Sequence, residues 1–446
     1  MSASKRPQIR QVEKDRFGEV FTPPTLINEM LDKLPPEVWT DPMKKWLDPA
    51  AGFGNFFMEV YPRLMKSLEH VIPEPSQRRR HILTQMLYMV EYNPESCTRI
   101  RENPIFFSNG DSANLCCGDF LDPTVGTTAF VQETVVQFDI IVGNPPFNAD
   151  QTHKGKKGGG ANLWPKFVEK SLHGGGGGSL LKPGGFLLFI HPALWRKPSS
   201  DRSSSVSTLF HKMTHENHML YLEIHNKLDG KRDFGVQTRY DYYIIQNRPP
   251  SQERGYMTHI KDQTGRVHES VDLAAWHFFL PNHSFEIIKP LLLSSHHVYN
   301  INTNNTMVLF SRCQYGSDQY WVSSTPDEEH IYPVVHSTPK TGPRMMWSSK
   351  RNTMFGVPKV IFGESGIHDV IIDIEGKYGM TQGAIGLKIT EAAGSDAVEQ
   401  EARQMKHVLE SSEFHTILDA MSFSNFRIDW RMFLYFRPDF YKKIKC

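Results

Sequence analysis

The sequence predicts an α/β protein: a Rossmann-like, doubly wound sheet followed by a C-terminal domain of mixed α+β structure. Apolar runs too short for helices, such as Phe138–Gly143 and Tyr240–Gln246, alternate with amphipathic helical stretches. A glycine-rich segment at 48–56, DPAAGFGNF, follows one such run and opens a helix. Beyond residues 248–251, Arg-Pro-Pro-Ser, the chain changes to shorter strand-like pieces rich in His, Asn, Ser and Pro. Strands that alternate with helices in the first part favour the doubly wound sheet.

The bulk composition is that of a globular protein with more than one core. With 446 residues, two domains are expected, and 39% hydrophobic with 22% charged residues excludes a disordered chain. No apolar run reaches membrane-spanning length, and the start MSASKRPQIR lacks the apolar core of a signal peptide. The five cysteines include no CxxC pair, which fits neither a disulfide framework nor a zinc site. We therefore expect an intracellular protein, cytoplasmic or nuclear, that is reduced, not secreted and holds no metal.

Three segments are expected along the chain. Residues 1–16 are polar and aperiodic, which indicates a flexible arm. Residues 17–248 carry the alternating helices and strands, and residues 249–446 form the second domain, with a clear amphipathic helix at 397–409. The first domain begins with an amphipathic helix at 25–34 that follows two prolines.

Basic residues occur only in local clusters, because the net charge is +1. Any one cluster is more often a solvated surface than a phosphate site. Composition therefore permits nucleic-acid binding without arguing for it. The clusters are Arg78–Arg80, Lys154 with Lys156 and Lys157, Arg196–Lys197, Lys231–Arg232, and Lys442, Lys443 and Lys445.

The first motif is the segment DPAAGFGNF. Gly52 and Gly54 let a ligand approach the backbone closely, as in the first turn of a nucleotide-binding sheet. A lone GxG fits a tight strand–helix turn equally well. Asp48, the acid before the glycines, suits a ligand with a cationic amino group better than a pyrophosphate.

Two acids at the ends of later strands form the second motif. Glu91, in YMVEYNP, is placed to accept the two hydroxyls of a ribose. Asp119, in CCGDFLD, is placed to accept from an adenine amine, with Tyr92 and Phe120 as apolar neighbours of the ring. Each acid alone is more often a surface or capping residue. As a series after Asp48, they trace a nucleoside across one edge of the sheet.

The most specific motif is Asn144-Pro145-Pro146-Phe147, directly after the strand FDIIVG. Consecutive prolines stiffen the backbone, so that the Asn144 side-chain oxygen and the Pro145 carbonyl can both accept from one NH2 group. Two such acceptors favour a pyramidal amine, whose lone pair can attack an electrophilic methyl group. Phe147 offers a stacking face for an extruded base.

In this order the motifs resemble the amino-methyltransferases of the N6-adenine and N4-cytosine type, in their gamma ordering. The matching segments are GEVFTPP at 18–24, DPAAGFGNF, Glu91, Asp119 and NPPF, and the resemblance covers about 17–247. The chain departs from the pattern at Ala51 and Phe53, where relatives commonly have Cys and Ser. Both glycines are kept, so cofactor binding is expected. Phe53 would give that side of the cofactor site a different shape.

The resemblance implies S-adenosylmethionine as cofactor and a base-flipping transfer to adenine N6 in double-stranded DNA. Asn144, Pro145, Pro146 and Phe147 would carry the transfer, and Phe234 resembles the second aromatic that sandwiches the flipped base. Lys154, Lys156 and Lys157 would contact phosphates. The implied cofactor residues are Phe21, Thr22, Pro23, Asp48, Pro49, Ala50, Gly52, Gly54, Glu91, Tyr92, Asp119, Phe120 and Asn144.

Several alternatives remain open at this stage. The motif does not distinguish DNA from RNA, and methyltransferases of protein glutamine also use NPPY or NPPF, although without a long C-terminal extension. Residues 249–446 would recognise the target sequence. There the aromatic and basic stretch 424–443 fits either a DNA contact or a core element, and 373–377, DIEGK, fits a hairpin better than a nuclease core.

Overall fold

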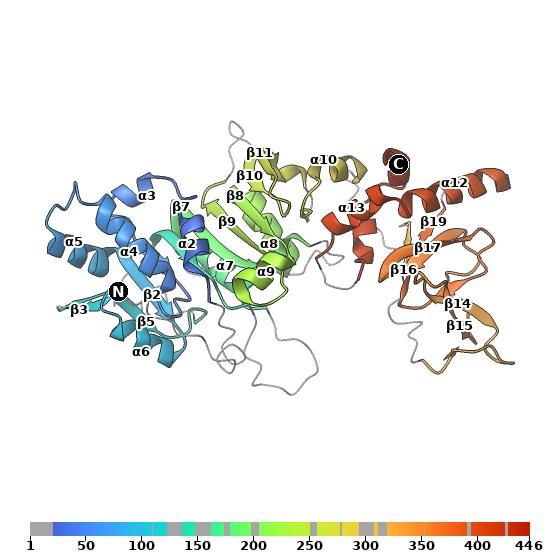
Figure 1. Ribbon diagram of the computed structural model, residues 1–446, viewed down its shortest axis with the longest axis horizontal. Coiled ribbons are helices and arrows are strands. Elements are labelled where there is room, and N and C mark those ends of the chain that lie inside the picture. Colours follow the sequence, from blue (N-terminus) through green and yellow to red (C-terminus); the bar gives the residue numbers. More distant parts are fainter. Residues whose placement is uncertain are drawn as a thin grey trace. The chain divides into compact units, whose positions relative to one another are not determined.

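The computed structural model divides into two compact units, Met1–Trp195 with Ser203–Ala274, and Arg196–Arg202 with Ala275–Cys446 (Figure 1). The three lysines Lys154, Lys156 and Lys157 lie outside the residues that the structure describes. Those residues are 21–108, 110–122, 136–147, 162–173, 179–197, 205–249, 257–276, 279–293, 307–310, 319–351, 353–389, 394–423 and 427–446.

A nine-stranded sheet forms the centre of the first unit, in the order β11-β10-β8-β9-β7-β6-β1-β2-β5. Strand β9 runs antiparallel to both of its neighbours and β11 antiparallel to β10, while the other neighbouring pairs are parallel. The strands are β1 Trp46–Asp48, β2 Leu87–Glu91, β5 Asn114–Cys117, β6 Phe138–Gly143, β7 Leu181–Pro192, β8 His218–His225, β9 Tyr240–Gln246, β10 Met257–Lys261 and β11 Val267–Asp272.

Helices cover both faces of this sheet, as the near-continuous apolar strands require. In β6, Ile140 and Val142 pack in one core with α2 and α4, while Ile141 between them faces the other way and is equally buried. The predicted Rossmann-like, doubly wound sheet is confirmed. The helices and small strands of the unit are α2 Pro24–Leu31, α3 Glu37–Thr40, α4 Asn55–Ser67, α5 Pro75–His81, η1 Ile82–Met86, α6 Pro94–Glu102, β3 Phe107–Ser108, β4 Asp111–Ser112, α7 Trp164–His173, η3 Ala193–Arg196, α8 Ser205–His211, η4 Lys212–Glu216, α9 Lys227–Phe234 and η5 Leu273–Ala275.

The first unit extends to Ala274, beyond the segment at 248–251 where the sequence placed the domain boundary. The reason is β10, which pairs in parallel with β8 and brings the β10–β11 hairpin into the sheet. Its residues, MTHIK and VHESVD, contain too few apolar side chains to be recognised from the sequence as strands of this sheet.

A disulfide joins Cys97 and Cys117, so the expectation of a chain without disulfides is wrong for this pair. Cys97 lies on α6 and Cys117 ends β5, and their Cα atoms are 6.2 Å apart although 20 positions separate them in the sequence. Only the packing of α6 beside β5 brings them together.

The second unit contains two four-stranded sheets, β12-β19-β16-β17 and β13-β15-β14-β18, with helices packed against β16 and β17, which confirms mixed α+β structure. Its strands are β12 Val308–Leu309, β13 Val322–Ser323, β14 Tyr332–Ser337, β15 Arg344–Ser348, β16 Lys359–Gly363, β17 Gly366–Asp373, β18 Gly379–Met380 and β19 Ala384–Lys388. Its helices are α10 Phe285–Ile288, η6 Lys289–Leu291, α12 Gly394–Leu409, α13 Ser412–Ala420, η8 Trp430–Leu434 and η9 Phe440–Lys443.

Two sequence alternatives in this unit can be compared with the structure. Asp373 is buried, and it accepts from Lys359 Nζ (2.6 Å) and from the backbone N–H of Lys377 (2.7 Å), which is the role of a turn residue and not of an exposed nuclease acid. Phe436 and Phe440 in the terminal stretch are also buried, so their rings belong to the core of the unit.

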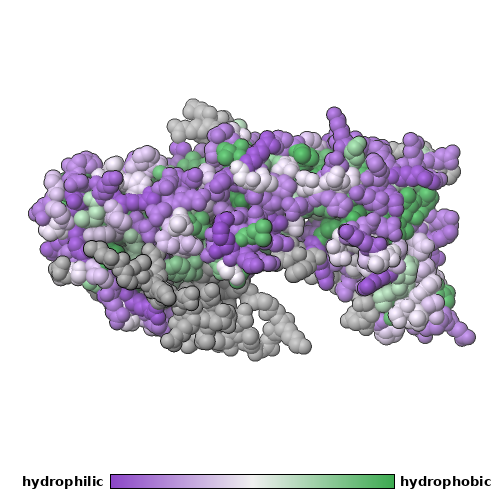
Figure 2. All heavy atoms as spheres, in the orientation of Figure 1, coloured by the Kyte–Doolittle hydropathy of each residue, from purple (hydrophilic) through white to green (hydrophobic). Residues whose placement is uncertain are grey.

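Polar and charged residues cover most of the face seen in Figure 2, with smaller apolar areas among them. Among the described residues, no helix is both long and apolar enough to cross a membrane. Within the same part of the chain, His, Cys, Asp and Glu side chains form no group of three or more that could hold a metal ion.

Candidate functional site

The carboxyl ends of three neighbouring parallel strands bring the predicted motifs together. Strand β1 ends at Asp48, β2 ends at Glu91, and β6 is followed by Asn144. Ligands of open α/β sheets bind outside this edge. The order of the strands therefore places residues nearly a hundred positions apart along one line.

Asp48 is a buried acid that has no cationic partner among the described residues. One oxygen, Oδ1, accepts from the backbone N–H of Ala50 (3.1 Å), while Oδ2 is buried and makes no hydrogen bond among the described residues. Burial, with a smaller contribution from the charge of Glu91, raises the pKa of Asp48 to about 8. A Cβ at position 143 would lie 3.0 Å from Asp48 Oδ1, so Gly143 leaves the room beside this carboxyl.

The glycine loop after β1 is held by Glu91. The backbone N–H of Gly52 donates to Glu91 Oε2 (2.7 Å), and that of Asn93 donates to Oε1 (2.7 Å). Gly52 and Gly54 have φ values of 56° and 80°, which non-glycine residues rarely adopt. Phe53, the departure from the family pattern, lies under the guanidinium of Arg99 at 4.6 Å from the ring centroid. Glu91 thus shapes the loop, a role that the sequence did not indicate.

The Asn144–Phe147 segment is held at both ends. Asn144 Nδ2 donates to Thr22 Oγ1 (3.0 Å), so the oxygen of the same planar amide points away from Thr22. At the other end, Phe147 O accepts from the backbone N–H of Leu163 (3.2 Å). Thr22 was predicted to contact a cofactor, and its bond to Asn144 could not be read from the sequence.

Phe147 and Phe234 are in contact, with ring centroids 6.4 Å apart and planes at 82°. Phe234 is buried and also packs on Tyr240. Two rings that sandwich a flat base must be nearly parallel. The present arrangement is an edge contact, so a base that enters between them requires Phe147 to turn.

The remaining predicted residues are less closely grouped. Asp119 is exposed and accepts from the backbone N–H of Leu121 (2.8 Å), and Tyr92 is 66% exposed. Phe120 is buried and stacks on Phe167 of α7, with ring centroids 5.1 Å apart, so its ring is already covered. Phe21 and Pro23, also predicted to contact the cofactor, flank Thr22 in the chain, and Pro49 and Ala50 follow Asp48. Pro145 and Pro146, predicted to take part in the transfer, follow Asn144.

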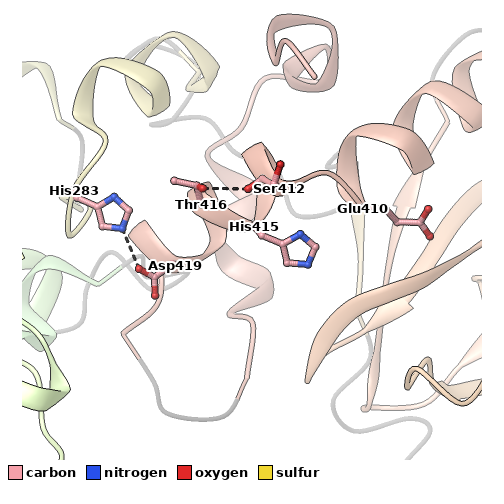
Figure 3. Close-up of a pocket in the computed structure, with 6 residues that line it drawn as sticks. All are labelled: His283, Glu410, Ser412, His415, Thr416 and Asp419. Carbon is pink, nitrogen blue, oxygen red and sulfur yellow. Dashed lines mark hydrogen bonds and ion pairs between the residues drawn. The ribbon is translucent and has the colours of Figure 1, made fainter. Parts of the chain in front are cut away.

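Two hollows lie outside these motifs. One, of about 480 Å³, opens at the carboxyl ends of β8 and β10 and includes Glu223, His225 and Lys261. The other, of about 620 Å³, belongs to the second unit (Figure 3). Its polar groups bond to the chain itself, as in the pair His283 Nε2 with Asp419 Oδ2 (3.0 Å).

Residues 105–226 match the family described as Eco57I restriction-modification methylase. A protein of Mycoplasma pneumoniae (strain ATCC 29342 / M129 / Subtype 1), named an uncharacterized adenine-specific methylase, is 40% identical over 91 residues. This match covers 20% of the present chain and 22% of that protein, so it spans about a fifth of the relative's length. The resemblance to the adenine amino-methyltransferase family is confirmed.

Two solved structures resemble nearly the whole of the present chain. The Type IIL restriction-modification enzyme MmeI, in complex with DNA, gives a TM-score of 0.51 at 10% identity, over 94% of this chain and 68% of its own. The ATP-dependent Type ISP enzyme LlaBIII, bound to DNA, gives 0.50 at 11% identity, over 91% of this chain and 38% of its own. At such identities the likeness concerns the fold alone.

Proposed function

We propose that this protein transfers a methyl group from S-adenosylmethionine to adenine N6 in double-stranded DNA. The observation that carries the proposal is the Asn144 amide, which Thr22 fixes at the end of β6. The neighbouring strand in the sheet, β1, ends at Asp48, whose Oδ2 makes no hydrogen bond among the described residues. The adenine specificity in the name of the Mycoplasma protein and the DNA in the two solved structures support the choice of substrate.

The residues at the carboxyl edge fit the proposed cofactor. Asp48 Oδ2 would accept from the cofactor's ammonium group, which would supply the partner that this oxygen lacks among the described residues. Gly52 and Gly54 would let the cofactor approach the backbone, while Glu91 and Asp119 would face its ribose and adenine. When bound, S-adenosylmethionine supplies an electrophilic methyl group on a sulfonium.

The chain itself would contribute two hydrogen-bond acceptors, held in a fixed position, to the transfer. Asn144 Oδ1 and the Pro145 carbonyl would accept the two hydrogens of the adenine amine, which frees its lone pair from the ring and aims it at the methyl group. Preorganised groups of this kind cost little reorganisation during the reaction. The base would stack on Phe147, with Phe234 on its other side after Phe147 turns.

The second unit would recognise the target sequence, and Lys154, Lys156 and Lys157 would contact phosphates. RNA adenine and protein glutamine are the alternative acceptors, because the Asn144–Phe147 motif selects an amine and not the chain that carries it. The protein is expected to lie inside the cell with its DNA.

The test is to incubate the full chain with labelled S-adenosylmethionine and either a mixed-sequence DNA duplex, the matching RNA duplex or a glutamine-containing peptide. Digestion of the DNA to nucleosides should yield labelled N6-methyladenine. Label in N4-methylcytosine would contradict the base assignment but keep the chemistry. Label in RNA or peptide alone would contradict the substrate, and no label in any acceptor would contradict the proposed activity.

A further inference from the structure

A buried histidine lies beside the segment that carries Asn144. His191 is fully buried near the end of β7, where its ring stacks on Trp164 with centroids 4.1 Å apart and planes at 16°. On its other side it meets the ring of Tyr243 at 5.2 Å. A buried polar ring in this position must satisfy both of its nitrogens.

Two hydrogen bonds fix the orientation of the His191 ring. Nδ1 lies 3.0 Å from the carbonyl oxygen of Pro192, which can only accept, so Nδ1 carries the proton. Nε2 lies 2.9 Å from Tyr243 Oη and, in the neutral ring, accepts from that hydroxyl. Burial raises the pKa of Tyr243 well above its usual value, so the hydroxyl keeps the proton that it donates. The hydroxyl and the ring therefore fix each other's orientation, and we call this pair the lock.

This lock is connected to the Asn144–Phe147 segment by two routes. Strands β6 and β7 pair in parallel with Gly143 opposite Phe189, and His191 and Pro145 each lie two residues beyond this pair. The other route runs through Trp164, since the backbone N–H of the preceding residue, Leu163, donates to Phe147 O. A shift of the stacked pair would therefore move the amide that fixes the end of the motif.

We propose that His191 and Tyr243 are positioning residues for the catalytic segment. They touch no reacting atom. The Tyr243 hydroxyl fixes the His191 ring, the ring holds Trp164, and Trp164 holds Leu163 where it fixes Phe147. The inference rests on the proposed function, because the segment that it positions is the proposed catalytic one.

The chain offers a matched pair of variants, Tyr243→Phe and Tyr242→Phe. Both tyrosines are fully buried on β9 and face opposite sides of the sheet, and Tyr242 donates to Glu223 and not to His191. Each variant loses one buried hydroxyl. Tyr243→Phe should lower kcat roughly tenfold, the size of one lost buried hydrogen bond, with the KM for cofactor unchanged. Tyr242→Phe should keep kcat within about twofold of wild type.

Amide hydrogen exchange of Leu163 in the full chain gives a readout that needs no activity. Tyr243→Phe should speed this exchange and Tyr242→Phe should not. Equal effects of the two variants on kcat and on Leu163 exchange would overturn the positioning role. If the wild-type protein methylates no DNA, the proposed function fails, while a selective effect of Tyr243→Phe on Leu163 still supports the mechanical link.

Discussion

The sheet of the first unit has one buried acid at the amino ends of its parallel strands and another at their carboxyl ends, and the pKa values of the two acids are shifted in opposite directions. We call these ends the amino edge and the carboxyl edge. At the amino edge, Asp139 near the start of β6 accepts from Lys182 Nζ (2.8 Å) and Lys44 Nζ (3.3 Å) and from the backbone N–H of Lys45 (3.0 Å). Burial raises the pKa of Asp139, but its hydrogen bonds to Lys182 and Lys45 and the lysine charges outweigh burial, so the pKa is lowered. At the carboxyl edge, burial raises the pKa of Asp48 to about 8, and no lysine of the described part of the chain lowers it.

Under the proposed function, the difference separates a residue that stabilises the fold, Asp139, from a residue that would bind the cofactor, Asp48. A buried charge is tolerated when it is paired, and one that is left unpaired costs stability. Asp139 is paired within the chain. Asp48 lacks such a partner, which is expected where a bound cation completes the site. The two edges should therefore respond differently to substitution.

The largest expected effect is at the carboxyl end of β6. Asn144→Ala should reduce turnover by about 10²–10³-fold, because it removes a preorganised acceptor used in the transition state. Cofactor binding should stay near wild type in calorimetry. Asn247→Ala is the control at the other edge, since Asn247 Nδ2 donates to Leu181 O (2.7 Å), and it should lower stability without lowering turnover. Near wild-type turnover of Asn144→Ala would remove this residue from the mechanism.

Asp48→Asn should weaken cofactor binding by about 10–100-fold, the value of one charge-assisted hydrogen bond. At pH 7 the carboxyl of Asp48 is mostly protonated, because its pKa is about 8, so binding of an ammonium group should release close to one proton. Calorimetry in buffers of different ionisation enthalpy measures this proton. Release that is undiminished in Asp48→Asn would show that the proton comes from elsewhere.

Removal of Asp139 should affect stability and leave function intact. Asp139→Asn should cost about 1–3 kcal/mol in the free energy of unfolding, because both lysines lose their buried partner.

The stability of the protein should depend on pH through both acids, with opposite signs. The lowered pKa of Asp139 contributes stability above about pH 4 that is lost as the pH falls through its folded value. The raised pKa of Asp48 removes stability as the pH rises from about 4 to about 8. Denaturant unfolding at a series of pH values measures how the free energy of unfolding changes with pH. Asp139→Asn should abolish the loss of stability at low pH, and Asp48→Asn should abolish the loss between about pH 4 and pH 8.

The smallest expected effect is at Thr22, a link between the predicted cofactor segment and the catalytic one. Thr22→Val keeps the shape but loses the acceptor for Asn144 Nδ2, and should lower kcat by about two- to tenfold. Thr22→Ser keeps the hydroxyl and should be near wild type. If both variants behave alike in steady-state kinetics, the hydroxyl does not orient Asn144.

The sequence predicted the sheet and the line of motifs well, because both depend on local patterns. FDIIVG is buried at every position of β6 and is apolar apart from Asp139, and a proline pair after a strand limits where Asn144 can point. It could not predict contacts across the fold. The bond between Thr22 and Asn144 joins residues 122 positions apart, and the stack of His191 on Trp164 depends on how α7 packs. Phe120 looked like a cofactor contact, but Phe167 on α7 covers its ring, a neighbour that no local pattern reveals.

The β10–β11 hairpin also determines where the chain can be shortened. Strand β8 lies between β9 and β10, so a protein that ends at Arg248 would expose the hydrogen-bonding edge of β8 along Tyr221–Glu223. An uncovered strand edge recruits strands from other molecules and leads to aggregation. A protein that ends at Ala274 keeps this edge paired, so poor yields of a shorter chain would reflect the lost hairpin and not a failure of the catalytic core to fold.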